Sequence, residues 1–204
     1  KPKTLVTASW GIEFTKIIEY KPLVDEALRI AKHPPSNVIL LQRPQCRAPM
    51  KEGTDFDWEE LISSAIPVKP VIVDSKDPLY ILYTSGTTGL PKGVVRENGG
   101  HAVALKYSMK SIFNTNPGEV YWAASDVGWV VGHSYIVYWP LIHSNTSVLF
   151  EGKPVGTPDA GTSRRVISEH NVRSFFKAPI AFRAIKREDP NGKYKAKFDL
   201  SFLN

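Results

Sequence analysis

One stretch of the chain carries most of the information about its fold and chemistry: Tyr83-Thr84-Ser85-Gly86-Thr87-Thr88-Gly89-Leu90-Pro91-Lys92-Gly93. It places four Ser or Thr residues, three glycines and one lysine within eleven positions. Glycines let main-chain N–H groups turn inward, hydroxyls add neutral donors, and an ammonium group offsets polyphosphate charge. A flexible surface loop is the usual alternative for such a segment, but this density of donors beside a lysine favours phosphate binding.

The stretch differs from the two commonest phosphate loops. The P-loop pattern G-x-x-x-x-G-K-[ST] leads into a helix, whereas here Pro91 stands fifth after Gly86 and Lys92 is followed by Gly93. The dinucleotide pattern G-x-G-x-x-G is not matched either. Apolar runs on both sides, at 79–83 and 93–96, predict that this loop connects two strands.

Outside the loop, the hydrophobic pattern alternates between strands and helices. We expect further strands at 3–9, 38–41, 120–124, 147–150 and 172–176, and helices at 22–33, from about Gly100, at 164–170 and at 180–187. Residues 43–68 predict a long connection with one short helix, and 129–139 a loop leading into a helix. The alternation predicts a layered α/β domain with a mainly parallel sheet. We divide the chain into an α/β segment at 1–75 and a part at 76–204 that carries the loop.

Two of the predicted helices have a definite apolar face. The first would bury Leu23, Ala27, Leu28 and Ala31, and the helix after Gly100 would bury Ala102, Leu105, Met109 and Ile112.

Composition excludes several classes of protein. A hydrophobic content of 42% argues against disorder, and the single cysteine, Cys46, excludes an internal disulfide framework and indicates a reducing, intracellular compartment. No run reaches the roughly 18 apolar residues of a membrane-spanning helix. We therefore expect no membrane segment, and the histidines show no metal-ligand spacing. The net charge of +6 leaves nucleic-acid binding as a weak alternative, but the basic residues are dispersed and no nucleic-acid partner is expected.

The loop resembles that of the AMP-forming acyl-CoA synthetases, whose pattern is Thr-Ser-Gly-Ser/Thr-Thr-Gly-x-Pro-Lys-Gly. Residues 77–82 (Asp-Pro-Leu-Tyr-Ile-Leu) and 126–135 (Asp-Val-Gly-Trp-Val-Val-Gly-His-Ser-Tyr) resemble the short-chain branch of that family. Residues 150–160 are more similar to propionyl-CoA synthetases than to acetyl-CoA synthetases. The resemblance covers nearly the whole chain and implies part of the large N-terminal domain of an adenylate-forming enzyme.

The resemblance also implies a reaction and a set of substrates. Such enzymes form an acyl-adenylate from a small carboxylate and ATP with Mg²⁺, release pyrophosphate, and pass the acyl group to coenzyme A. Carried over, the ATP phosphates would be bound by Thr84, Ser85, Gly86, Thr87, Thr88, Gly89 and Lys92, with Lys92 as the catalytic residue. The acyl pocket and coenzyme A tunnel would be lined by Trp129, Val130, Val131, Gly132 and Val155. By themselves, the valines and tryptophan at 129–131 are more typical of a core.

Several positions depart from the family pattern. Trp139-Pro140 stands where relatives usually have Gly-Pro, Lys177 and Ile180 stand where they usually have Thr, and Val131 replaces the Thr of many acetyl-activating relatives. The family's adenine-binding segment, magnesium motif and adenylation lysine lie on later sequence. We therefore expect a fragment of an enzyme, inactive alone, from the mitochondrial matrix or the cytoplasm. A non-catalytic nucleotide-binding module is the alternative; the preferred carboxylate and the oligomeric state are left open.

Overall fold

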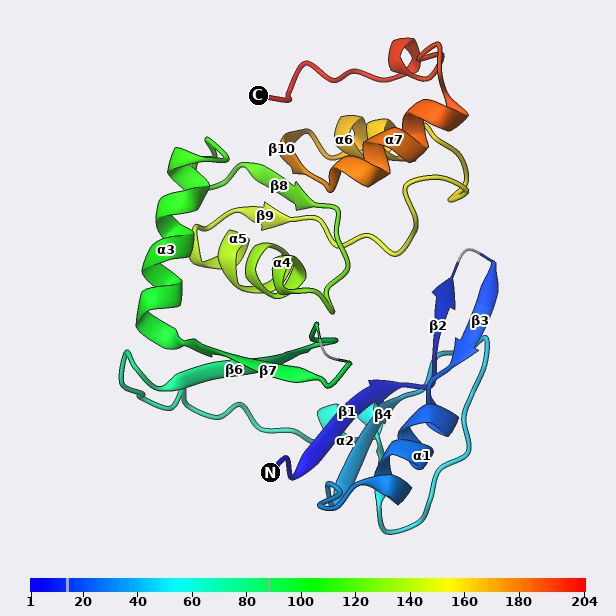
Figure 1. The fold of residues 1–204 in the computed structure, drawn as a ribbon, viewed down its shortest axis with the longest axis vertical. Helices are drawn as coiled ribbons and strands as arrows, with labels where there is room; N and C mark the ends of the chain where they lie inside the picture. The colour runs from blue at the N-terminus through cyan, green and yellow to red at the C-terminus, as the bar shows by residue number, and fades with distance from the viewer. Residues whose placement is uncertain (14, 88) are drawn as a thin grey trace. The chain divides into compact units, whose positions relative to one another are not determined.

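The computed structural model describes residues 1–13, 15–87 and 89–204. These residues form two compact units, Lys1–Pro70 and Val71–Asn204, each described by itself below (Figure 1). Within the described ranges, no helix has both the length and the apolar character needed to cross a membrane.

The first unit is built on a parallel sheet of three strands in the order β1-β4-β5. These strands are β1 (Thr4–Ala8), β4 (Asn37–Leu41) and β5 (Asp55–Asp57). An antiparallel hairpin of β2 (Trp10–Glu13) and β3 (Lys16–Glu19), and the helices α1 (Lys21–Ile30) and α2 (Trp58–Ser63), complete the unit. The hairpin and β5 were not predicted, because segments this short show little periodicity.

Helix α1 does not bury the face that its apolar residues predict. Leu23, Ala27 and Ala31 are exposed, and Leu28 is only half-buried. The fully buried residue of α1 is Lys21, whose Nζ lies 2.9 Å from Asp55 Oδ2 on β5 and 2.6 Å from Asp25 Oδ1 one turn later. The predicted face was wrong because an ion pair, which hydrophobic periodicity does not register, orients this helix.

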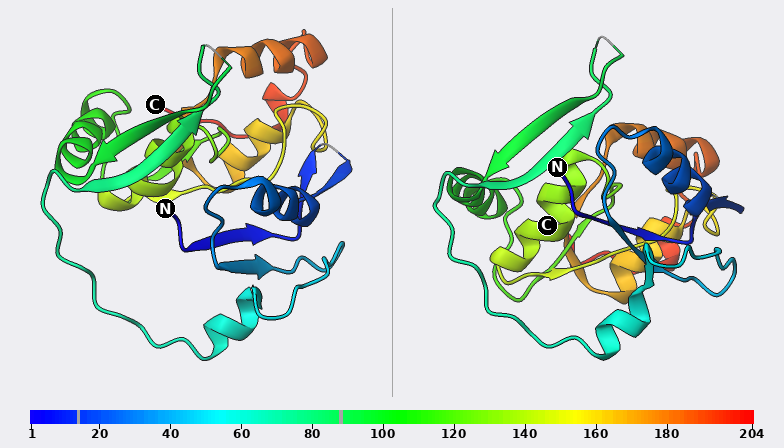
Figure 2. Two further views of the ribbon diagram at one scale, coloured as in Figure 1. Left: turned by 60° about the horizontal axis from the view of Figure 1, so that its bottom comes forward. Right: turned by 90° about the horizontal axis from the view of Figure 1, so that it is seen from below.

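The second unit begins with an extended segment and a long antiparallel hairpin, drawn in green in Figure 2. The hairpin consists of β6 (Pro78–Thr84) and β7 (Lys92–Glu97) and runs directly into α3 (Asn98–Ser111). Residues 65–74, which precede it, have no helix or strand. The hairpin confirms the prediction that the glycine-rich loop connects two strands.

A parallel sheet in the order β10-β8-β9 forms the centre of the second unit. Its strands are β8 (Val120–Ala123), β9 (Thr146–Ser147) and β10 (Val172–Phe176), so the strand predicted at 147–150 is shorter and earlier than expected. Between β8 and β9 lie α4 (Val130–Gly132), the π-helix η1 (His133–Tyr138) and α5 (Trp139–Ile142). Helices α6 (Thr162–Glu169) and α7 (Pro179–Glu188) and the 3₁₀ turn η2 (Lys195–Lys197) follow.

Strand β8 explains why helices cover both faces of this sheet. Alternate residues of a strand point to opposite faces, and here Tyr121 and Ala123 enter one core cluster while Trp122 enters another. Leu105 and Met109 of α3 join the first cluster as predicted, and residues of α6 join the second. Both three-stranded sheets are parallel, which confirms the α/β fold class.

The prediction for the end of α3 was wrong. Ile112 is 70% exposed, because the helix ends at Ser111 and Phe113 instead packs against Tyr121 in the core.

Candidate functional site

The glycine-rich loop forms the tip of the β6–β7 hairpin. Thr84 pairs with Lys92, so residues 85–91 connect the two strands. Gly86 and Gly89 adopt φ of +64° and +79°, a region that side chains disfavour. A Cβ on Gly86 would also collide with the carbonyl oxygen of Leu90. Both glycines are therefore required by the turn itself.

The loop presents side-chain donors that the rest of the chain does not use. Thr84, Ser85, Thr87 and Lys92 are exposed, and among the residues that the structure describes none makes a side-chain hydrogen bond or ion pair with them. Thr88, also predicted for this site, lies outside the described residues. Unused hydroxyls and an ammonium group beside turned glycines suit a polyanionic ligand.

The two faces of the hairpin differ. The pairs Tyr80–Arg96, Leu82–Val94 and Thr84–Lys92 share one face, since residues two apart point the same way. On that face Tyr80, Leu82, Val94 and Arg96 are half-buried, whereas Ile81 and Val95 on the other face are each 56% exposed. Lys92 and Thr84 therefore extend the half-buried face toward the tip.

Tyr80 joins this face of the hairpin to the helical segment that follows residue 129. Its ring stacks on Tyr138 at 5.6 Å between centroids and lies 5.1 Å from the ring of His133, both in η1. His101 of α3 meets the Tyr80 ring edge-on, with its Nε2 3.4 Å from the Tyr80 hydroxyl. Burial, together with the charge of Arg96, lowers the pKa of His101 below its usual value. The structure thus packs the hairpin directly against η1.

The residues at 129–132, predicted to line the acyl pocket, lie at the N-terminal end of this helical segment. A turn at Asp126 precedes them, in which the Asp126 carboxylate accepts from the Gly128 N–H at 2.7 Å. Trp129 is 69% exposed, Val130 is 36% exposed, and Val131 is half-buried. The π-helix begins at once after Gly132, and π-helical turns are frequent at functional sites.

Gly132 has a packing role that the sequence does not show. A Cβ there would collide with the carbonyl oxygen of Asp126 and the Cα of Val127. The buried Gly132 backbone therefore lies directly against the turn that precedes the predicted pocket.

Val155 lies apart from that segment along the chain, in the bends that follow β9. It is half-buried, and the adjoining Gly156 has a φ of +75°. The Lys153 N–H donates to Thr157 Oγ1 at 3.1 Å, and Thr157 O accepts from the Thr162 hydroxyl at 2.5 Å. These bonds anchor the loop to the start of α6.

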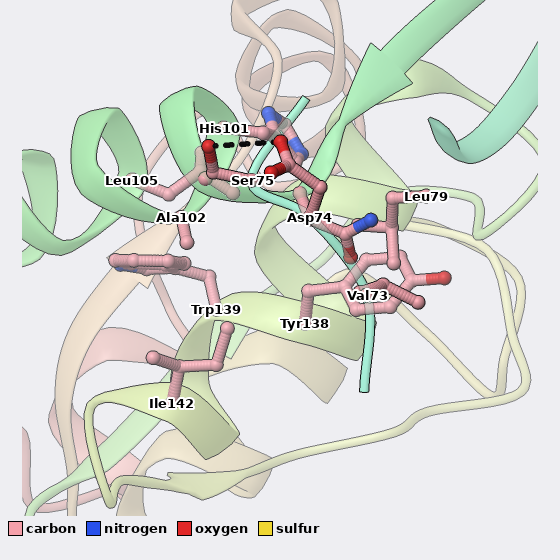
Figure 3. A pocket seen from close by; sticks show the side chains of 12 residues that line it. Val73, Asp74, Ser75, Leu79, His101, Ala102, Leu105, Tyr138, Trp139 and Ile142 are labelled. Carbon is pink, nitrogen blue, oxygen red and sulfur yellow. Dashed lines mark hydrogen bonds between the residues drawn. The ribbon is translucent and has the colours of Figure 1, made fainter. Parts of the chain in front are cut away.

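The structure also contains a cavity that sequence analysis did not predict (Figure 3). It has a volume of about 410 Å³ and lies between α3, the end of η1, α5 and residues 73–79. Trp139, whose position departs from the family pattern, is fully buried and forms one wall opposite Ala102. Among the predicted site residues that the structure describes, none lines this cavity.

The described part of the chain contains no group of three or more His, Cys, Asp and Glu side chains placed to hold a metal ion.

Comparison with known proteins identifies the family. Residues 1–204 match the sequence model of a family described as AMP-binding enzyme. The chain belongs to that family.

The most informative relatives of this member of the AMP-binding enzyme family are acyl-CoA synthetases. It is 56% identical over 202 residues to the human protein named acyl-CoA synthetase short-chain family member 3, mitochondrial, which covers 98% of the chain and 29% of the relative. It is 39% identical to an acetyl-coenzyme A synthetase of Pasteurella multocida, covering 98% of the chain and 30% of the relative. The chain thus spans about 30% of the length of these relatives.

A solved structure supports the same assignment. The acetoacetyl-CoA synthetase from Streptomyces lividans superposes with a TM-score of 0.83 at 27% identity, covering 100% of this chain and 30% of that protein. The match confirms that the chain has the fold of the N-terminal domain of an adenylate-forming enzyme.

Proposed function

We propose that the chain is part of an ATP-dependent short-chain acyl-CoA synthetase. The reaction would join propionate or acetate to coenzyme A through an acyl-adenylate, with release of AMP and pyrophosphate. The observation that carries the proposal is the hairpin loop with its unused donors, packed through Tyr80 against the helix that follows residue 129. The names of the relatives support this reaction class.

In this proposal the loop holds the β- and γ-phosphates of ATP. The positive φ of Gly86 and Gly89 turns the backbone sharply, which allows a ligand to approach main-chain N–H groups. Thr84, Ser85, Thr87 and Thr88 add hydroxyl donors. Lys92 supplies the charge that stabilises pyrophosphate as it departs, because a fixed cation acts most strongly where charge develops.

The acyl group would lie against the segment Trp129, Val130, Val131 and Gly132, with coenzyme A approaching past Val155. Indole and valine side chains offer an apolar surface of limited depth, suited to acetate, propionate or butyrate. The half-buried Val131 and the exposed Trp129 leave apolar surface at this entrance for a ligand to cover.

ATP would be used with Mg²⁺, which neutralises phosphate charge when bound. The described side chains provide no carboxylate cluster for such an ion. Because Mg²⁺ in nucleotide sites takes most of its ligands from phosphates and water, the proposal assigns no residue of this chain to it. In this proposal the partners are small molecules and the site of action is intracellular, in the mitochondrial matrix or the cytoplasm. The name of the human relative includes the word mitochondrial.

The test is carboxylate-dependent exchange of pyrophosphate into ATP by a full-length protein that contains these 204 residues. We expect exchange with propionate or acetate and its loss in Lys92→Ala. Lys106→Ala, an exposed lysine on α3, is the control and should behave as the wild type. Binding of ATP without exchange under any short carboxylate would overturn the proposal and favour a non-catalytic nucleotide-binding module.

A further inference from the structure

Lys177 occupies the edge of the sheet at which ligands of parallel α/β folds usually bind. It directly follows β10, whose last residue, Phe176, pairs with Ala123 of β8. The Ala124 N–H donates to the Phe176 carbonyl at 2.9 Å, so Lys177 lies beside the chain leaving β8 toward residues 126–132. Ligands of parallel sheets bind beyond the carboxyl ends of the strands, and this is that end.

The ammonium group of Lys177 rests on aromatic rings. Its Nζ lies 5.9 Å from the centroid of Trp122 and 5.6 Å from that of Phe175. The side chain is half-buried, and within the ranges that the structure describes no carboxylate or other polar group bonds to it. It therefore has neither the full hydration of a surface lysine nor the acidic partner of a buried one.

This environment favours the neutral amine. Burial lowers the pKa of Lys177 to about 8. The two rings favour the charged form, but at the outer limit of the roughly 6 Å range of such contacts they compensate only weakly. With this pKa, about a tenth of Lys177 is an unprotonated nucleophile at pH 7, a larger fraction than for a lysine with the ordinary pKa.

We propose that Lys177 is a site of covalent acylation by activated short-chain acyl groups, a modification that rests on the proposed function for its acyl donor. The neutral amine of Lys177 attacks the carbonyl carbon of an acyl-adenylate. An amide N–C bond forms, the C–O bond to the phosphate breaks, AMP leaves, and the amine proton passes to water. No oxidation or reduction is involved. Acylation removes the charge beside Trp122.

The first experiment supplies synthetic propionyl-adenylate to the full-length protein across a range of pH and measures propionylation of each lysine by peptide mass spectrometry. We expect the rate of Lys177 modification to rise with pH through a midpoint near 8. Lys106 and Lys110 on α3 are exposed and serve as the reference lysines. Near neutral pH, Lys177 should react on the order of tenfold faster than these two lysines. Equal rates or a shared midpoint would overturn the proposal.

A second experiment lets the protein make its own donor from ATP and propionate without coenzyme A. We expect propionylation at Lys177 in the wild type and equally in Lys106→Arg, an exposed control on α3 that should retain pyrophosphate exchange. If pyrophosphate exchange is absent, the proposed function is refuted. The first experiment then still tests whether Lys177 reacts with supplied propionyl-adenylate. If exchange occurs and Lys177 stays unmodified, self-acylation is refuted.

Discussion

At the scale of single residues, the site depends on side chains that the fold leaves without partners. Lys92 pairs with Thr84 at the base of the loop, and neither side chain bonds to another described residue. Their exposure costs the fold little and leaves both groups available to a ligand. Substitutions here should therefore change chemistry more than stability.

Lys92→Ala in the full-length protein should slow acyl-adenylate formation by about a hundredfold, the order typical of losing one donor that stabilises developing charge. Thioester formation from supplied acyl-adenylate should be nearly unchanged, because pyrophosphate has already left. Single-turnover measurement of both half-reactions checks this, with Lys106→Ala as control. Equal losses in both half-reactions would indicate that Lys92 supports folding.

Val131→Thr should shift substrate preference toward acetate. Val and Thr have nearly the same volume but differ by a hydroxyl, so the change makes the wall more polar without making it smaller. Since one buried methylene contributes about 0.8 kcal/mol, we expect the preference for propionate over acetate to fall roughly fourfold. Competition between the two acids measures the ratio, with Val137→Thr, an exposed position on η1, as control. An unchanged ratio would remove Val131 from the pocket.

At the scale of elements, the entrance to the helical segment is fixed by backbone packing. Gly132 lies against the Asp126–Val127 backbone, and η1 continues from it toward Tyr138, which stacks on the hairpin through Tyr80. The position of the loop-bearing hairpin is thus linked through η1 to the turn before Trp129.

Gly132→Ala should destabilise the second unit by about 1–3 kcal/mol, the usual penalty for overpacking. The neighbouring atoms at Gly132 are backbone and cannot rotate away. Gly100→Ala in α3 is the matched control, because its Cβ would meet only the flexible Glu97 side chain. That variant should be neutral or more stable by up to about 1 kcal/mol, as for Gly→Ala in a helix. Urea denaturation measures the stability of both variants. Similar stabilities of Gly132→Ala and Gly100→Ala would show that the turn at Asp126 can shift to accommodate the added methyl group.

At the scale of the whole molecule, the two units are stabilised differently. The second has two aromatic and aliphatic clusters around β8, whereas the first contains a buried ion pair between Lys21 and Asp55. Asp55 pairs with the buried Val38 of β4. The Lys21 side chain is 2% exposed and that of Asp55 is 1% exposed. Removing one charge from such a pair leaves the other buried and unpaired.

Lys21→Met should therefore destabilise the first unit by about 3–5 kcal/mol, and Lys21→Met with Asp55→Leu should recover much of that loss. Hydrogen exchange read on separate peptides should show lost protection in residues 1–70 and little change in 71–204. Lys16→Met, at an exposed position of β3, is the control. A double variant no more stable than the single one would contradict the ion-pair explanation.

The same cluster makes the first unit sensitive to acid. Burial alone would raise the pKa of Asp25, but hydrogen bonds from Lys21 and Lys51 outweigh it and hold that pKa below its usual value. A carboxyl group whose pKa is lowered by folding stabilises the fold above its unfolded pKa, near ~3.9, and this contribution is lost as the pH falls further. Below about pH 4, the urea concentration at which half of the first unit is unfolded should therefore decrease. The decrease should be smaller in Asp25→Asn. The same pH dependence in Asp25→Asn would refute this assignment.

Sequence alone determined those helices, strands and turns that depend on residues close together in the chain. Strand β10 and the helices α6 and α7 follow from short apolar patterns, and the hairpin loop follows from glycines that a tight turn requires. The family resemblance also depends on local sequence, because the glycine-rich loop at 84–93 is one continuous string.

Tertiary structure decided what depends on residues distant in the chain. The stacking of Tyr80 on Tyr138, the pairing of Lys21 with Asp55, and the packing of Lys177 on Trp122 each join segments that no periodicity relates. Hydrophobic patterns report which side of an element is apolar, but the orientation of α1 and the environment of Lys177 depend on charges and rings that other segments supply. That is why the hairpin that carries the loop could be predicted from local sequence, whereas its neighbours in space could not.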